Sequence, residues 1–316
     1  MRPTRREVLF GSMALASVGG MSDAAAEIGI VDTHQHLWDL RRLRLPWLPT
    51  SGPLSGNHTM DDYLREAQGL GIEKTIYMEV DVPPEQHPQE AEYVLSLCGK
   101  RGSPLVGVVL GGRPADPGFG DYLERFSADR RVRGIRQVLH SAATPQGYCL
   151  RPEFIRGIRL LGKMGLTFDV CLPAAYLEDA AQLADACPET RLILDHCGNP
   201  NVQEGIQDSW KRAMADIARR PYVACKISGI IATVKADGWS VEDLRPFVLH
   251  CREVFGPDRI LFGSDWPVCT LKARLRQWVT ALRQIIAPWP RQEQRKLLRD
   301  NALRWYGIDR GGRSLE

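Results

Sequence analysis

Eight short, apolar, β-branched runs alternate with longer amphipathic segments along the chain. The runs are Ile28–Thr33, Thr75–Val80, Leu105–Leu110, Gly134–Leu139, Thr167–Leu172, Leu192–His196, Val223–Ser228 and Ile260–Ser264. The amphipathic segments include Met60–Leu70, Glu90–Lys100, Pro152–Met164, Leu177–Ala186 and Val241–Phe255. Strands that alternate with helices form parallel sheets, because two parallel neighbours need a long crossover connection between them. The alternation therefore predicts an α/β fold with a parallel sheet.

The number of these units favours a single (β/α)8 barrel. Eight strand-and-helix units within residues 27–316 match the usual size of a closed barrel, and continuously apolar strands are expected where both faces are buried. An open doubly wound sheet is the alternative, but no G-x-G-x-x-G or G-x-x-x-x-G-K-[ST] motif follows any run. We predict one barrel domain over residues 27–316, with Arg291–Gly307 as its last outer helix.

The first 26 residues have the composition of a signal peptide. The Arg5-Arg6 pair precedes a weakly apolar run, Val8–Ala16, and the small residues Ala24–Ala26 follow. This order is typical of a cleaved export signal, and the arginine pair indicates the twin-arginine type. We therefore predict a signal peptide over residues 1–26 and export to the periplasm, with a disordered basic start or an anchor as the alternative. No other segment reaches transmembrane length, so stable membrane insertion is not expected.

Charge and cysteine content limit the partners and the bound metals. The 41 basic and 38 acidic residues give a net charge of +3 without a basic stripe, which argues against nucleic-acid binding and favours a small-molecule partner. The eight cysteines contain no C-x-x-C pair, so neither a zinc knuckle nor a disulfide framework is indicated. We expect mostly buried thiols, with one disulfide possible after export. None of these patterns predicts an oligomeric state.

Three histidines and one aspartate fall at the ends of predicted strands. His34 and His36 follow directly after the first run, His196 ends the sixth, and Asp265 follows the eighth. Catalytic side chains of such barrels lie at the carboxyl ends of the strands, and period-two alternation turns both His34 and His36 to one side. Together the four could bind a divalent metal, or polarise a carbonyl while Asp265 takes a proton from water. We predict that they form a catalytic centre.

Longer motifs around these residues resemble the amidohydrolase superfamily. In that superfamily H-x-H closes the first strand, a His the sixth and an Asp the eighth, and the likeness is greatest to its lactone-hydrolysing branch of sugar lactonases and dicarboxypyrone hydrolases. The motifs that carry the resemblance are DTHQHLWD at 32–39, GIR at 134–136, DHCGNP at 195–200, CKISG at 225–229 and FGSDWP at 262–267. They extend over the whole chain that follows the predicted signal.

The resemblance implies a lactone hydrolase in which Asp265 is the general base. His196 and the His34/His36 pair would stabilise the developing oxyanion, directly or through a bound divalent metal such as zinc. Departures from the wider superfamily bear on that metal. The fifth run, Thr167–Leu172, has no His, and residues 134–140 have no bridging Lys, which argues against a binuclear centre. One zinc on His34, His36 and Asp265 and a metal-independent mechanism both stay open.

Other residues are candidates for binding the substrate. Arg136 and Lys226 are cations near strand ends that suit carboxylates or polarised carbonyls, unless Arg136 faces outward to a helix carboxylate. His140 and Trp38 are the remaining candidates; Trp38 belongs to residues 37–58, which form either a lid or simple packing over the barrel mouth. Asp169 either stands where other members of the superfamily carry a metal-binding His or orients a neighbour, and Asp195 is expected to point away from His196 and to anchor the backbone.

Two alternative functions stay open at this point. One is a metal-dependent decarboxylase of the same superfamily, which the missing His in Thr167–Leu172 makes less favourable. The other is an exported protein that binds a small acid without turning it over, since a fold does not guarantee catalysis. The presence of all four polar residues speaks against the second alternative.

Overall fold

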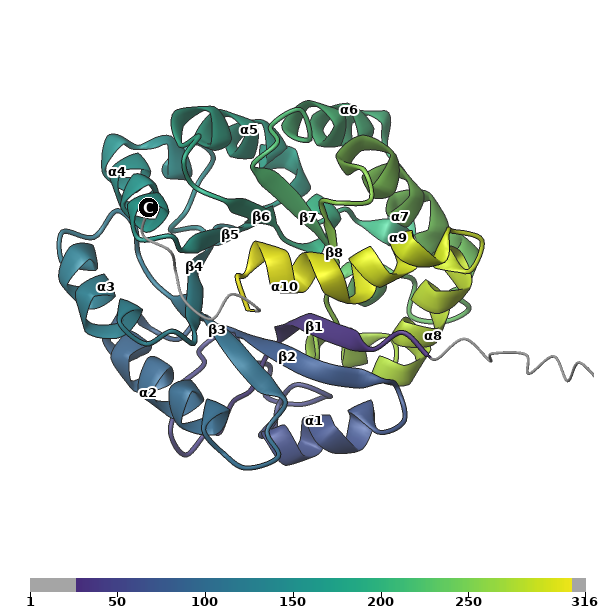
Figure 1. Ribbon diagram of the computed structural model, residues 1–316, viewed down its shortest axis with the longest axis horizontal. Coiled ribbons are helices and arrows are strands. Elements are labelled where there is room, and N and C mark those ends of the chain that lie inside the picture. Colours follow the sequence, from purple (N-terminus) through teal and green to yellow (C-terminus); the bar gives the residue numbers. More distant parts are fainter. Residues whose placement is uncertain (1–26, 309–316) are drawn as a thin grey trace, which may run out of the picture.

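The computed structural model describes residues 27–308, which form one barrel. Eight parallel strands pair in sequence order. They are β1 (Ile30–Gln35), β2 (Ile72–Met78), β3 (Leu105–Gly111), β4 (Val132–Val138), β5 (Thr167–Cys171), β6 (Leu192–Leu194), β7 (Val223–Ile227) and β8 (Ile260–Phe262). Each lies within a few residues of a predicted run, and Figure 1 shows them as a ring with helices outside.

The ring closes where β8 meets β1. A parallel bridge joins Gln35 to Trp266, the amide of His36 donates to the Trp266 carbonyl at 2.8 Å, and the Asp265 amide donates to the His34 carbonyl at 2.8 Å. Closure leaves the interior of the sheet to side chains, because a barrel of eight strands is filled rather than hollow. The predicted (β/α)8 barrel is confirmed, and its closure brings the ends of β1 and β8 together.

The outer layer consists of helices that follow the strands. They are α1 (Met60–Ala67), α2 (His87–Cys98), α3 (Phe119–Ser127), α4 (Pro152–Lys163), α5 (Leu177–Ala186), α6 (Asp208–Ile217), α7 (Val241–Phe255) and α8 (Leu275–Ile286). Five match the predicted amphipathic segments, and α3, α6 and α8 are additional. Each buries an apolar face against the sheet, as a surface helix does. Within residues 27–308, no helix has the length and apolarity needed to cross a membrane.

The C-terminal helical segment lies across the amino-terminal end of the barrel, so its prediction as the last outer helix is wrong. Helix α9 (Arg291–Arg295) continues through a π-helical turn (Lys296–Asp300) into α10 (Asn301–Trp305), and Figure 1 shows this segment crossing the centre of the ring. Its apolar side chains pack against inward-facing strand residues, and the outer position is taken by α8. The residues of this cluster are Ala302, Leu303, Trp305, Tyr306, Val31, Ile76, Val109, Ile193, Ala224 and Leu261.

Two further predictions concern the termini and the thiols. The predicted signal peptide, residues 1–26, lies outside the described residues, and export stays a prediction. All eight cysteines are free, and every one except Cys98 is buried, in accord with the expected buried thiols.

Candidate active site

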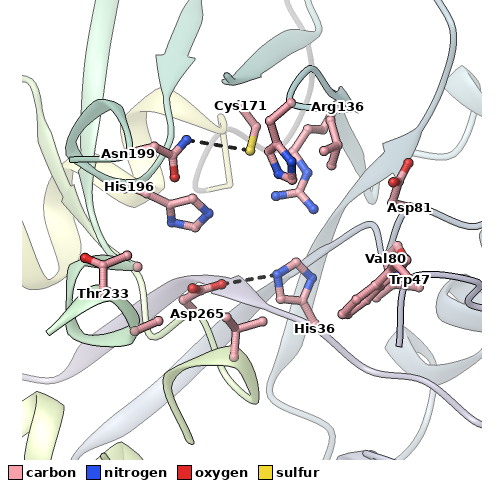
Figure 2. Close-up of a pocket in the computed structure, with 15 residues that line it drawn as sticks. His36, Trp47, Val80, Asp81, Arg136, Cys171, His196, Asn199, Thr233 and Asp265 are labelled. Carbon is pink, nitrogen blue, oxygen red and sulfur yellow. Dashed lines mark hydrogen bonds and ion pairs between the residues drawn. The ribbon is translucent and has the colours of Figure 1, made fainter. Parts of the chain in front are cut away.

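A cavity of about 310 Å³ opens at the carboxyl ends of the strands. In Figure 2 the side chains of His36, Arg136, His196 and Asp265 converge on it. Its full lining is His36, Trp47, Val80, Asp81, Arg136, Val138, His140, Cys171, His196, Asn199, Gly229, Ala232, Thr233, Asp265 and Val268. The volume suits a small molecule, near the lower limit for ligand pockets.

His36 and Asp265 face each other across the junction of β1 and β8. Nε2 of His36 lies 3.3 Å from Oδ1 of Asp265, while Nδ1 is 3.0 Å from the carbonyl oxygens of both Met78 and Glu79. Carbonyl oxygens only accept hydrogen bonds, so Nδ1 carries a proton and Nε2 is directed at the carboxylate. The backbone after β2 thereby fixes the orientation of this ring.

His34 lies deeper, fully buried beneath the cavity. Its Nε2 is 3.7 Å from Oδ1 of Asp265 and 3.2 Å from a guanidinium nitrogen of Arg136, and its Nδ1 is 3.3 Å from Nζ of Lys226. Burial, reinforced by the charge of Lys226, lowers the pKa of His34 well below its ordinary value. The ring is therefore neutral and sits between two cations.

His196 approaches the same point from the end of β6. Its Nδ1 is 2.9 Å from the Ser228 hydroxyl, and its ring centroid is 4.4 Å from that of His34. Burial lowers the pKa of His196. Gly229, with a φ of +67°, lets the ring sit where it does, because an added Cβ would lie 2.4 Å from Nδ1 of His196.

Arg136 reaches the cavity from β4 and is held by an acidic residue that sequence reasoning missed. Its Nε donates to Oε1 of Glu79 at 2.6 Å, and its NH2 group donates to the Glu79 carbonyl at 2.8 Å. Both side chains are buried. Burial alone would raise the pKa of Glu79, but the charge of Arg136 outweighs it and the pKa is lowered. Glu79 follows β2, so inspection of every strand end could have found it.

Lys226 lies under the cavity in a network of buried charges. Its Nζ is 2.6 Å from Oδ2 of Asp169 and 3.1 Å from Oδ1 of Asp195, and all three side chains are fully buried. The Tyr306 hydroxyl donates to the same Asp169 oxygen at 2.6 Å, which ties the C-terminal segment to this network. Buried charges are tolerated when they are paired in this way. Lys226, a predicted candidate for binding the substrate, therefore lies in the barrel interior and is not among the residues that line the cavity.

Asp195 also differs from its prediction. It was expected to face away from His196 and to anchor the backbone, but its side chain points inward, 3.4 Å from Arg136 and 3.5 Å from Nδ1 of His34. Burial opposes ionisation, yet the charge of Lys226 holds the pKa of Asp195 well below its usual range. The backbone explains the difference, because His196 has a φ of +54°, which ends the strand alternation.

The remaining substrate candidates divide between the cavity and the core. Arg136 and His140 line the cavity. Trp38 does not fill its predicted role: it is fully buried, donates from Nε1 to the Gly56 carbonyl at 2.7 Å, and packs edge-on behind Trp47. Trp47, from the same segment, lines the cavity and is 41% exposed. Residues 37–58 thus both pack over the mouth and contribute to it.

One aspartate fixes the junction that carries the site. Asp32 on β1 accepts hydrogen bonds from the Ser264 amide at 2.8 Å, the His34 amide at 3.1 Å and the Tyr63 hydroxyl at 2.7 Å. Its side chain is fully buried, and burial raises its pKa. Asp32 therefore holds the end of β8 against β1, which sets Asp265 opposite the two histidines.

The residues at this junction fit one divalent metal ion. Ligand atoms of His34, His36 and Asp265 lie within 4.8 Å of one another, and two imidazoles with one carboxylate are a common donor set for catalytic zinc. The lone pair of His36 Nε2 and the carboxylate of Asp265 face each other, an arrangement that a cation or a shared proton stabilises. Arg136 competes for Nε2 of His34, so that ligand is the least available of the three.

Residues 31–308 match the family described as Amidohydrolase. The chain belongs to the amidohydrolase family. This makes it a hydrolase, as the motifs predicted. Among curated relatives, an L-fucono-1,5-lactonase of Burkholderia multivorans is 30% identical, covering 77% of this chain and 83% of its own length. A 4-sulfomuconolactone hydrolase of Rhizobium radiobacter is 26% identical, covering 76% of each chain.

Solved structures of the same family share the fold of this amidohydrolase. An amidohydrolase from Burkholderia multivorans with bound zinc superimposes with a TM-score of 0.78 at 23% identity, covering 88% of this chain and 99% of that one. At this identity the likeness concerns the barrel alone. It agrees with the closed ring of eight strands described above.

Proposed function

We propose that this amidohydrolase opens an uncharged, hydroxylated lactone, with Asp265 as the general base. The observation that carries the proposal is the convergence of Asp265, His36 and His196 on one small cavity. Relatives named as lactone hydrolases support it, and a lactone suits the site because its ring oxygen is a better leaving group than an amide nitrogen.

In this mechanism Asp265 takes a proton from a water molecule that attacks the lactone carbonyl. The backbone of Asp265 is held at the junction with β1 by the donation of its amide to the His34 carbonyl at 2.8 Å. The C–O bond to the ring oxygen then breaks, and Asp265 returns the proton to that oxygen. The products are the open hydroxy acid and the regenerated carboxylate of Asp265.

His196 stabilises the oxyanion that forms on the carbonyl oxygen. In this role Nδ1 accepts from the Ser228 hydroxyl, 2.9 Å away, and the ring proton is on Nε2, on the side of the cavity that His196 lines. The lowered pKa keeps the ring neutral, so it donates a hydrogen bond without becoming a competing acid. Arg136 adds a fixed positive charge nearby, and preorganised donors of this kind account for much of the rate enhancement in acyl transfer.

If a divalent ion binds, His34, His36 and Asp265 would hold it, and it would supply polarisation of the carbonyl or of the attacking water. The roles given above to Asp265, His196 and Arg136 do not require this ion.

The charges of the cavity lining favour a neutral substrate. Its carboxylates belong to Asp81 and Asp265, whereas its guanidinium, Arg136, is already paired with Glu79 and Asp195. A substrate with its own carboxylate or sulfonate would meet the carboxylate of Asp265. Among the lining residues Asp81 is paired with Arg113 and Arg136 with Glu79 and Asp195, so no unpaired cation faces such a substrate, which is unfavourable in a partly desolvated site. The hydroxyl-binding groups Asp81, Asn199 and Thr233 suit a sugar-derived ring.

The test is proton release from a panel of lactones at equal concentration. Neutral sugar γ- and δ-lactones form one arm, and lactones that carry a carboxylate or sulfonate form the other. The proposal predicts turnover in the neutral arm and little in the anionic one. Turnover confined to the anionic arm would refute the proposed substrate class, and no turnover in either arm, together with release of CO2 from aromatic acids, would favour a decarboxylase instead.

A further inference from the structure

Three cysteine thiols meet on the outer side of the barrel wall, away from the cavity. Cys197 lies in the turn after β6, Cys225 on β7 and Cys251 on α7, and each is fully buried. Their sulfur atoms lie within 4.8 Å of one another, and those of Cys225 and Cys251 are 3.9 Å apart. The function proposed above uses none of the three.

The fold holds these thiols in fixed positions. On β7, Lys226 points into the barrel, so its neighbour Cys225 points outward to the layer of helix α7. Cys197 adopts a φ of +53°, which costs energy for a residue with a side chain, and the Trp210 indole donates to its carbonyl at 2.9 Å. Three separate elements therefore hold the sulfur atoms close together, and the backbone is strained at one of the three cysteines, Cys197.

The spacing matches that of three ligands around one ion. Sulfur atoms bound in a plane at the ~2.3 Å metal–sulfur distance would lie about 4.0 Å from each other. Within residues 27–308, this group of candidate ligands has three members, all of them cysteine. Zinc almost always takes four ligands in structural sites, whereas Cu(I) is soft and selected by thiolates. A buried site of three sulfurs therefore suits Cu(I) better than Zn²⁺.

We propose that Cys197, Cys225 and Cys251 form a buried binding site for one Cu(I) ion. On binding, each thiol that becomes a thiolate ligand releases its proton to solvent, and the single positive charge of Cu(I) offsets one of the negative thiolate charges. The oxidation state of copper does not change. The site is distinct from the candidate active site and stands or falls independently of the proposed lactone hydrolysis.

The test measures copper retained by the intact protein. Protein from copper-supplemented cells is purified without oxygen and challenged with bicinchoninate, a chelator specific for Cu(I). The wild type is expected to keep one copper per chain, with only sulfur neighbours by X-ray absorption. Cys251→Ser, on α7 and remote from the cavity, is expected to keep less than about a tenth of that amount, because changes around a metal site weaken binding by such factors or more. Cys187→Ser, a buried thiol outside the cluster, should keep it all.

Three outcomes would overturn the proposal. They are wild-type protein that is free of copper after the challenge, Cys251→Ser that retains as much copper as the wild type, and copper bound by nitrogen and oxygen. The last result would assign the metal to His34, His36 and Asp265 instead. Circular dichroism and thermal melting of each variant report folding. If Cys251→Ser does not fold, the X-ray absorption spectrum of copper in the wild type is the test of the proposal.

Discussion

Nε2 of His36 lies 3.3 Å from Oδ1 of Asp265, and the backbone after β2 fixes the opposite side of the same ring. Because Nδ1 donates to two carbonyl oxygens, the His36 ring is held in one orientation, and its Nε2 faces the Asp265 carboxylate. This rigid pair lies at the junction where β8 closes onto β1. The proposed catalysis by Asp265 depends on that junction.

Removal of divalent metal is expected to leave most of the lactone hydrolysis intact. Arg136 lies 3.2 Å from Nε2 of His34, the atom that would be the third ligand of a metal, and supplies a fixed positive charge there. The measurement compares the rate before and after dialysis against a chelator, with metal content determined in both samples. A loss of about tenfold or more that zinc alone restores would contradict this expectation.

Replacing Ser228 by Ala is expected to lower kcat about tenfold and to change KM little, because loss of one orienting hydrogen bond costs about 1 kcal/mol or somewhat more. The buried Ser228 hydroxyl lies 2.9 Å from Nδ1 of His196, so it orients the ring without being among the residues that line the cavity. Ser96→Ala, at an exposed position, is the matched control. An unchanged kcat in Ser228→Ala would remove the assigned role of His196 as an oriented donor.

Tyr306→Phe is expected to destabilise the fold by about 1–3 kcal/mol, because Asp169 would lose a buried hydrogen-bond donor. The Tyr306 hydroxyl lies 2.6 Å from Oδ2 of Asp169 and joins the C-terminal segment to the barrel interior. Chemical unfolding of the variant and of Tyr222→Phe gives the comparison, because the Tyr222 hydroxyl donates a longer hydrogen bond, 3.2 Å, to the Ala184 carbonyl at a partly buried position. Equal losses in the two variants would mean that this buried contact contributes nothing specific.

Glu90 is expected to make stability depend on pH. Burial, with the charge of Glu79, raises the pKa of Glu90 from 4.5 to about 8, so between these values the folded protein keeps a proton that the unfolded chain releases. The stability due to protonated Glu90 is complete below pH 4.5 and is lost as the pH rises through about 8.

The matching measurement is the free energy of unfolding of the wild type and Glu90→Gln at about pH 5 and about pH 8.5, which bracket the expected titration. The variant keeps an uncharged side chain at every pH, so its stability relative to the wild type should increase toward alkaline pH. Glu124→Gln, at an exposed position, should track the wild type. Parallel pH dependence in Glu90→Gln and the wild type would show that Glu90 does not titrate in this range.

The barrel and the four central residues were predictable because they depend on local periodicity. Apolar runs specify buried parallel strands, and period-two alternation in His-x-His turns both rings to the same side, where their centroids are 4.9 Å apart. The C-terminal segment was not predictable in the same way. An amphipathic helix has the same pattern whether it covers the outside of a barrel or its end, so the sequence did not distinguish α10 from an outer helix.

The orientations of Asp195 and Trp38 were mispredicted for a related reason. Although β6 ends at Leu194, Asp195 is still extended and faces the interior like Ile193 two residues before it, so the alternation breaks only at His196. The left-handed turn that begins there allows His196 to face the cavity while Asp195 faces the interior. In residues 37–58 two tryptophans are equivalent by composition, and only the path of the loop decides that Trp47 lines the cavity while Trp38 is buried.

The most direct test of the central claim is the rate of proton release from a neutral sugar lactone by wild-type protein and by Asp265→Asn. The variant removes the general base but keeps the size and hydrogen-bonding capacity of the side chain, so the rate should fall by roughly 10²–10⁴-fold with an unchanged melting temperature. Asp121→Asn, at an exposed position on α3, should match the wild type. Turnover by a folded Asp265→Asn protein at the wild-type rate would contradict the assignment of Asp265 as the base.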